Sequence, residues 1–105
     1  MIVSRLILIA AAALLTSSSV LAADDTLTIG FTVSRTGKLN NDSIAQMRGF
    51  ELWRDEVNDK GGISVGGKQY KINFVSYDDE SVNARVQQLY TRLINQDKAQ
   101  FLFSP

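Results

Sequence analysis

Three consecutive polar residues, Ser34-Arg35-Thr36, follow an apolar stretch rich in β-branched residues at 27–33, and Tyr77 closes a second such stretch. The hydroxyl groups can donate or accept hydrogen bonds, and the guanidinium of Arg35 suits a carboxylate. Tyr77 offers an aromatic wall that carries a hydroxyl group. Each hydroxyl has an alternative use in bonding its own loop or a helix start. Ligand contact and local structure therefore both stay open for these four residues.

Asp78-Asp79 follows Tyr77 directly and has two interpretations. Two adjacent carboxyl groups can hold a metal ion or perform acid–base chemistry. An acidic residue between a strand and a helix, however, usually caps that helix and suits its positive end. Because a helical pattern begins shortly after Asp79, with Ser81 as a further candidate cap, we favour capping over chemistry.

Several function classes are excluded by composition. The 105 residues contain no histidine and no cysteine, so neither a catalytic triad based on these residues nor a thiolate or histidine zinc site can be built. Gly30 and Gly37 are too far apart for a G-x-G-x-x-G motif, and no phosphate-binding P-loop motif occurs. Eleven basic and eleven acidic residues balance, which disfavours nucleic-acid and anionic-membrane surfaces. We expect no enzyme and no cofactor.

The first 22 residues have the order of a secretory signal peptide: a charge at Arg5, an apolar run at 6–15, polar residues at 16–19 and then Val20-Leu21-Ala22. A membrane anchor is the alternative, but the apolar run is shorter than the roughly 20 residues that cross a bilayer. We therefore expect cleavage after Ala22, export, and a mature domain over residues 23–105. Without a cysteine near the cleavage site, a lipid anchor attached through one is excluded.

The mature chain alternates strand and helix patterns. Strands are predicted over 27–33, from Tyr70 to Tyr77, and from 99 to 103. The first helix is expected to start with Asp42 or Ser43 as its cap and to stop at Lys60-Gly61-Gly62. Gly66-Gly67 predicts a hairpin turn. Two apolar stripes mark the buried helix faces: Ile44, Met47, Phe50, Trp53 (or Arg54) and Val57 in the first helix, and Val82, Val86, Leu89 and Leu93, with Ile94 beside them, in the second. Trp53 is interpreted as a packing residue.

The order β-α-(hairpin)-β-α-β predicts an α/β fold with a partial Rossmann-like parallel sheet and helices on both faces. In such sheets a ligand binds beyond the carboxyl ends of the strands. Three segments should meet there: 34–41, 77–80 and Ser104-Pro105. Parallel sheets are rarely complete at three strands, so we expect further strands outside this chain, and exposed apolar faces without them.

Several motifs occur in one order along the mature chain. They include Thr36-Gly37, the run Glu56-Val57-Asn58-Asp59-Lys60-Gly61-Gly62-Ile63, the turn Gly66-Gly67, the run Tyr77-Asp78-Asp79-Glu80-Ser81, and Phe101-Leu102-Phe103-Ser104-Pro105. Together they resemble the N-terminal segment of the type I periplasmic solute-binding proteins of ABC transporters, in the leucine/isoleucine/valine-binding branch. The resemblance covers essentially all of residues 23–105, but only the start of the first of the two lobes that family members close around a ligand.

The resemblance implies a periplasmic protein that binds an amino acid, an amide or an aromatic or organic acid and delivers it to an ABC permease in the inner membrane. It places ligand contacts at Ser34, Arg35 and Thr36, a cleft wall at Tyr77, and the start of the main ligand-binding turn at Ser104. Two departures from the family pattern stand out. Ser104 replaces an expected glycine, and Arg35 replaces a small or apolar residue, which hints at a ligand with additional negative charge or polarity. A fragment of this length is not expected to close on a ligand alone.

Three rival interpretations stay open. The same fold serves as the extracellular ligand-sensing domain of some receptors. An enzyme of similar α/β topology would need a His- or Cys-bearing motif beyond Pro105. A small autonomous interaction protein is the third alternative. The ligand, the transporter and the oligomeric state do not follow from these residues.

Overall fold

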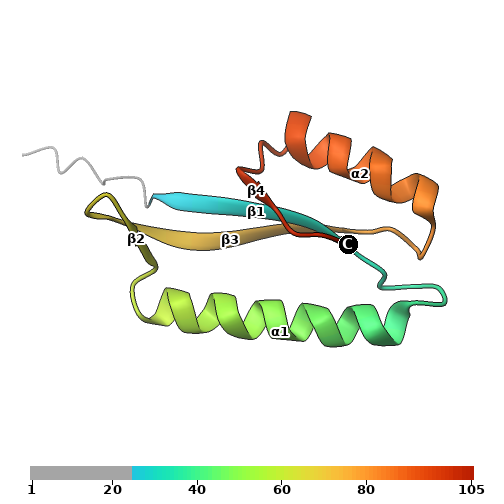
Figure 1. Ribbon diagram of the computed structural model, residues 1–105, viewed down its shortest axis with the longest axis horizontal. Coiled ribbons are helices and arrows are strands. Elements are labelled where there is room, and N and C mark those ends of the chain that lie inside the picture. The colour runs from blue at the N-terminus through green and yellow to red at the C-terminus, as the bar shows by residue number, and fades with distance from the viewer. Residues whose placement is uncertain (1–24) are drawn as a thin grey trace, which may run out of the picture.

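The computed structural model describes residues 25–105, and the predicted signal peptide at 1–22 lies outside this range. The elements in chain order are β1 (Thr26–Val33), α1 (Asn40–Asp59), β2 (Ile63–Val65), β3 (Lys68–Asp78), α2 (Asn83–Asn95) and β4 (Phe101–Leu102) (Figure 1). The predicted order of strands and helices, including the hairpin, is confirmed. The last strand is shorter than predicted, and the second is a single strand of 11 residues. Neither helix in the described range is long and apolar enough to cross a membrane.

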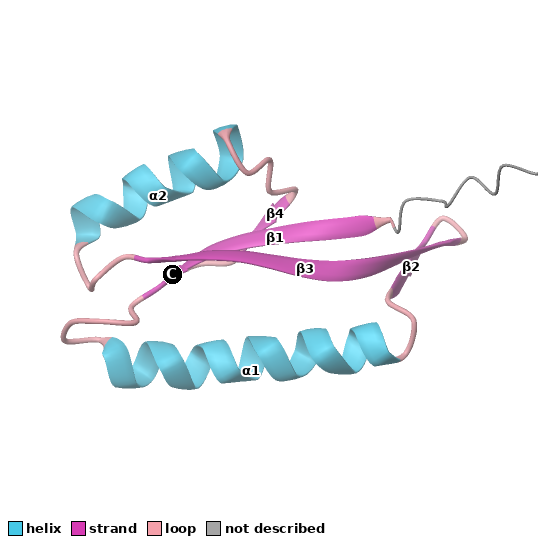
Figure 2. Ribbon diagram, turned by 180° about the vertical axis from the view of Figure 1, so that it is seen from behind, coloured by secondary structure: helices cyan, strands magenta, loops and turns pink. Residues whose placement is uncertain are grey.

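The four strands form one sheet in the order β2-β3-β1-β4. β1 lies in the middle and runs parallel to both β3 and β4, whereas β2 pairs antiparallel with β3. The helices α1 and α2 lie on opposite faces of the sheet (Figure 2). This arrangement is what right-handed crossovers predict. The connection through α1 moves from β1 to β3 on one side, and the connection through α2 moves back past β1 to β4, so the two helices cover opposite faces.

The core forms where β1 faces the two helices. Alternation along β1 points Ile29, Phe31 and Val33 toward α1, and all three are buried. The ring of Phe31 packs edge-on against Phe50 of α1 and Phe74 of β3, with centroids 5.4 and 5.2 Å away. On the other face, fully buried Leu93 of α2 lies so close to Gly30 that an added Cβ would come within 3.0 Å of it. Gly30 therefore permits the close approach of α2 to the sheet.

Asn58, in the run of residues 56–63 noted in the sequence, fixes the end of α1 to β3. The side-chain amide of Asn58 accepts a hydrogen bond from the Ile72 N–H at 2.8 Å and donates one to the Ile72 carbonyl at 2.9 Å. The chain then reverses at Gly61 and Gly62, both with positive φ, as predicted. A Cβ on Gly62 would lie 2.1 Å from the Tyr70 carbonyl oxygen, so only glycine fits.

The hairpin turn at Gly66-Gly67 is also confirmed. Both glycines have positive φ (59° and 80°), the conformation of a tight two-residue turn, and the flanking residues Val65 and Lys68 are paired. This hairpin pairs β2 with residues 68–70, so it covers the outer edge of β3 only at the start of that strand.

The predicted helix caps are wrong. Helix α1 begins at Asn40, two residues before Asp42, and its N-cap residue Leu39 makes no side-chain cap. Helix α2 begins at Asn83, and Val82 precedes it, again without a side-chain cap. The candidate caps Ser43, Asp78, Asp79 and Ser81 instead bond to neighbouring loops, because the carboxyl ends of β1 and β3 bring those loops within reach.

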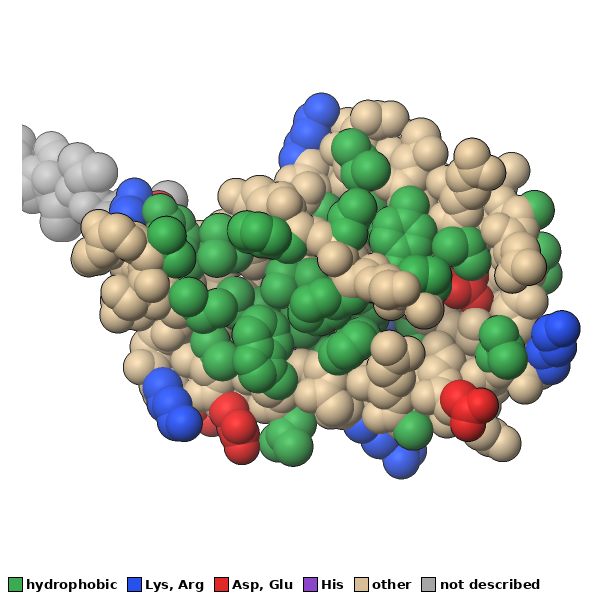
Figure 3. Space-filling view, in the orientation of Figure 1, with side chains coloured by type: hydrophobic (Ala, Val, Ile, Leu, Met, Phe, Trp, Pro, Cys, Tyr) green, Lys and Arg blue, Asp and Glu red, His purple; other side chains and the backbone are tan. Residues whose placement is uncertain are grey.

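Trp53 packs between elements, as expected of a packing residue, but it lies at the margin of the core. It is 39% exposed, and Arg54 takes the inward position, with its guanidinium 5.0 Å from the centre of the Phe74 ring. Trp53 borders Phe103, at a centroid distance of 6.3 Å. Beside it, an apolar groove of about 360 Å³ opens on the sheet face, lined by Leu27, Ile29, Ile63, Val65, Ile72, Phe101, Leu102 and Phe103. Hydrophobic side chains are accordingly gathered across this view of the molecule (Figure 3).

Candidate functional site

A pocket of about 470 Å³ lies at the carboxyl ends of β1, β3 and β4, beside the point where the strand order reverses. This is the position at which open α/β sheets bind ligands. The first turns of α1 and α2 form the sides of the pocket. Its lining residues are Thr32, Ser34, Leu39, Asp42, Ser43, Gln46, Asp79, Ser81, Val82, Asn83, Val86 and Pro105.

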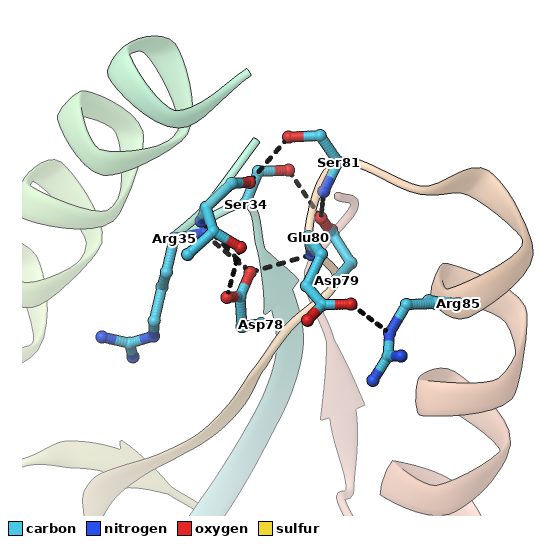
Figure 4. Close-up of polar contacts among 8 residues, drawn as sticks. Ser34, Arg35, Asp78, Asp79, Glu80, Ser81 and Arg85 are labelled. Atoms are coloured by element: carbon cyan, nitrogen blue, oxygen red, sulfur yellow. Dashed lines mark hydrogen bonds and ion pairs between the residues drawn. The ribbon is translucent and has the colours of Figure 1, made fainter. Parts of the chain in front are cut away.

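A buried hydrogen-bond network centred on Ser34 and Asp79 forms the floor. Ser34 is the first residue after β1, and its hydroxyl donates to Asp79 Oδ1 at 2.6 Å. The Ser81 N–H donates to the same oxygen at 2.9 Å. The Ser34 N–H donates to the Ser43 hydroxyl oxygen at 2.7 Å. Ser34 and Asp79 are both almost fully buried, and their bond links the ends of β1 and β3 (Figure 4). The bond from Ser34 to Ser43 adds the start of α1 to this network.

Asp78 organises the loop beside the pocket. Its Oδ1 accepts the N–H groups of Arg35 at 3.0 Å and Glu80 at 2.8 Å, and its Oδ2 accepts the Thr36 hydroxyl at 2.9 Å (Figure 4). Burial raises the pKa of the Asp78 carboxyl, but the hydrogen bonds from Glu80, Thr36 and Arg35 outweigh it, so the pKa lies below its usual value. A carboxyl group with this many donors serves loop structure.

The loops after β1 and β3 are further joined through Ser81. Its hydroxyl donates to the Thr36 carbonyl oxygen at 2.9 Å and accepts the Leu39 N–H at 3.1 Å. Gly37, with φ of 90°, lets the two loops touch, because an added Cβ would lie 2.6 Å from Ser81 Oγ. Glu80 and Ser81 both adopt positive φ, a conformation that costs free energy for residues with a side chain and often occurs at functional sites.

The predicted site residues do not all come together. Ser34 lines the pocket, whereas Arg35, Thr36, Tyr77 and Ser104 are absent from its lining. The Arg35 guanidinium donates to Ser76 Oγ at 3.1 Å, on the outer side of the loop, and Thr36 bonds Asp78. Ser104 is exposed beside Pro105, which does line the pocket.

Tyr77 is turned toward α2. Its hydroxyl donates to Asp97 Oδ2 at 2.6 Å, and the Arg92 guanidinium lies 4.6 Å above its ring. The hydrogen bond to Asp97, together with burial, raises the pKa of Tyr77. Ligand contact by Tyr77, Arg35, Thr36 and Ser104 stays a prediction.

Thr32 is a pocket residue that the sequence reasoning missed. It belongs to β1, where alternation with Phe31 and Val33 puts it on the same face as Ser34. A polar residue at an otherwise apolar strand end was the available signal. The prediction began instead at the loop, with Ser34, two residues after Thr32.

The chemistry of the lining is mild. It combines hydroxyl groups, side-chain amides and two carboxyl groups with apolar side chains that supply the larger part of the surface, and none of the lining residues is basic. Within residues 25–105, no three acidic residues are grouped to hold a metal ion. A volume of this size suits a small organic molecule held by hydrogen bonds.

Comparisons with known proteins agree with this geometry. The family model described as periplasmic binding protein matches residues 26–105. The chain belongs to the periplasmic binding protein family. Periplasmic binding proteins are solute-binding proteins, and the family name assigns its members to the periplasm.

Two solved structures of transporter proteins share the fold. One is LivJ, the branched-chain amino acid transporter substrate-binding protein of Streptococcus pneumoniae str. Canada MDR_19A, in complex with isoleucine. It is 33% identical, with a TM-score of 0.69, over 77% of this chain and 22% of LivJ. The other is a putative branched-chain amino acid ABC transporter protein from Silicibacter pomeroyi, 34% identical with a TM-score of 0.67, over 76% of this chain and 19% of that one. The chain therefore spans about a fifth of the length of these relatives.

Proposed function

We propose that this chain is the start of the substrate-binding protein of an ABC uptake system. In this proposal the protein binds an amino acid or a similar small polar solute in the periplasm and delivers it to a permease in the inner membrane. The observation that carries the proposal is the pocket at the switch point of the sheet, which combines polar groups with apolar side chains, in a chain that belongs to the periplasmic binding protein family. The isoleucine bound to LivJ supports an amino acid as the solute class.

Within this pocket, Ser34 is the proposed ligand contact that the geometry supports best, because it lines the pocket and is held rigidly by Asp79 and Ser43. Ser104 is proposed as the start of a second contact region beside Pro105. Arg35 lies on the outer side of its loop and none of the lining residues is basic, so the pocket favours a neutral or zwitterionic solute over one with additional negative charge.

The chemistry required of such a protein is reversible binding. We propose no catalytic residue, because the polar groups of the pocket are hydroxyls, amides and carboxyls that bond one another and the backbone. Export by a signal peptide cleaved after Ala22 is part of the proposal, and the mature domain then begins at Ala23.

Binding is tested on the protein that its gene encodes, including whatever the reading frame carries after the codon for Pro105. The purified protein is unfolded and refolded to remove any bound solute and is then titrated calorimetrically with L-isoleucine, L-leucine, L-valine, L-glutamate, acetamide and urea. We expect a neutral amino acid or an amide to bind and L-glutamate to bind more weakly. Absence of binding to the whole panel, in a protein that melts cooperatively, would contradict the proposed function.

Export is tested separately. Mass spectrometry of the protein from the periplasmic fraction should give an N-terminus at Ala23. A protein that retains residues 1–22 and stays with the membrane would favour the anchor interpretation.

A further inference from the structure

The hydroxyl of Thr32 is a buried group without a hydrogen-bond partner. Thr32 is 5% exposed, and within residues 25–105 its Oγ1 is the sole buried side-chain nitrogen or oxygen that lacks a partner. The nearby Tyr90 hydroxyl accepts the Thr32 N–H and donates to the Phe103 carbonyl oxygen, but it makes no hydrogen bond with the Thr32 hydroxyl. Native proteins rarely leave such a group unpaired, so an unpaired hydroxyl at the wall of a pocket indicates a missing partner.

The first turn of α2 determines which kind of partner fits. Val82 and Asn83 at this helix start line the same pocket as Thr32. The helix has no side-chain cap and no acidic residue within its first turn, although the carboxylates of Asp79 and Glu80 lie just before it. Such an end attracts an oxygen atom that carries negative or partial negative charge. Thr32 can meet that oxygen by donating its hydroxyl hydrogen.

The carboxyl groups of the pocket do not occupy this position. Asp79 lies on the floor, where its Oδ1 accepts from Ser34 and Ser81. Asp42 extends from the first turn of α1, which covers the opposite face of the sheet from α2. The Asp42 carboxylate therefore comes from α1, whereas the positive helix end comes from α2. The part of the pocket that suits a solute oxygen lies between β1 and α2.

We propose that Thr32 is a ligand-contacting residue of the pocket, whose hydroxyl donates a hydrogen bond to a carboxylate or carbonyl oxygen of the bound solute. The inference rests on the proposed function, since it identifies a contact within the same site. It adds a residue from the strand itself to contacts otherwise expected from the loops.

The test compares three variants of the protein encoded by the complete gene. Thr32→Val keeps the shape of the side chain and removes the hydroxyl, whereas Thr32→Ser keeps the hydroxyl. Thr28→Val makes the same chemical change on the same face of β1, outside the pocket, and is the matched control. Each protein is titrated with L-isoleucine, followed by the other solutes of the panel, and the melting temperature of the solute-free protein is recorded.

We expect Thr32→Val to lower the affinity about tenfold, the usual effect of one lost hydrogen bond. Thr32→Ser and Thr28→Val should bind nearly as the unchanged protein does. The solute-free Thr32→Val protein should melt at the same temperature as the unchanged protein or higher, because the hydroxyl has no partner to lose.

Two results would overturn the inference while the proposed function stands: undiminished binding by Thr32→Val, or a clearly lower melting temperature of its solute-free form, which would reveal a partner inside the protein. If the unchanged protein binds no member of the panel, the proposed function fails first and the inference fails with it. The two failures are therefore distinguishable.

Discussion

Replacing Gly37 by alanine should be far more damaging than the same change at Gly61, although both glycines have positive φ (90° and 101°). Alanine in the left-handed region costs about 1–2 kcal/mol at either position. At Gly61 nothing lies within 4 Å of the added Cβ, so this conformational cost is the whole effect. At Gly37 the added Cβ would lie 2.6 Å from the Glu80 carbonyl oxygen and from Ser81 Oγ, so the loop must also move.

Movement of Ser81 breaks the two hydrogen bonds of its hydroxyl, to the Thr36 carbonyl and from the Leu39 N–H. At about 1 kcal/mol for each bond, Gly37→Ala should lower the free energy of unfolding by about 3–4 kcal/mol in total. Urea unfolding of the three proteins, followed by the fluorescence of Trp53, measures both values. Equal losses for Gly37→Ala and Gly61→Ala would refute the claim that loop contact, and not φ alone, requires glycine at position 37.

Three further predictions concern the groups around the pocket. Asp79→Ala should lower the free energy of unfolding by about 2–3 kcal/mol and Ser34→Ala by about 1–2 kcal/mol. The double variant should lose less than the sum of the two, because the two residues share one hydrogen bond. Additive losses in urea unfolding would contradict this prediction. Folding lowers the pKa of the Asp78 carboxyl group, so the ionised carboxylate stabilises the folded protein. This stabilisation is fully present above about pH 4, the ordinary pKa of the group, and is lost as the pH falls through the folded-state pKa. Asp78→Asn should therefore flatten the acid limb of a plot of melting temperature against pH, and an unchanged limb would argue against the hydrogen bonds from Glu80, Thr36 and Arg35 as a source of stability. Tyr77→Phe removes the bond to Asp97 and should lower the melting temperature while solute affinity is kept; a loss of affinity would instead support Tyr77 as a cleft wall.

The order of the strands and helices was predictable because the spacing of the apolar residues indicates each element and the glycines indicate the turns between them. The apolar stripe of α1 and the glycines after it determine where that helix packs and ends, and the structure confirms both. The helix starts were not predictable in the same way. A capping residue is inferred from local spacing, yet Ser43 and Asp79 bond to residues that the chain brings close only after the sheet has formed.

The same limit applies to the site. Sequence reasoning predicted a site at the strand ends, because the topology favours it, and a pocket lined by Ser34 lies there, while ligand contact stays a prediction. Sequence reasoning could not predict that Arg35 turns outward to Ser76 or that Tyr77 faces α2. These orientations depend on which residues of β1 and β3 lie side by side, and that register is known only from the structure. Sequence reasoning missed Thr32 because an unpaired hydroxyl is defined by its three-dimensional surroundings.

The central position of β1 has a consequence for how the protein assembles. The first strand to be synthesised pairs with partners about 45 and about 70 residues further along, at Lys71–Asp78 and Phe101–Leu102. Pairing over such separations is slow, so the local β2–β3 hairpin can form before the parallel pairs that involve β1. The pocket, which is lined by residues at and just beyond the ends of the parallel strands β1, β3 and β4, is therefore among the last features of this segment to form, and a chain caught before that point still has an unpaired β1.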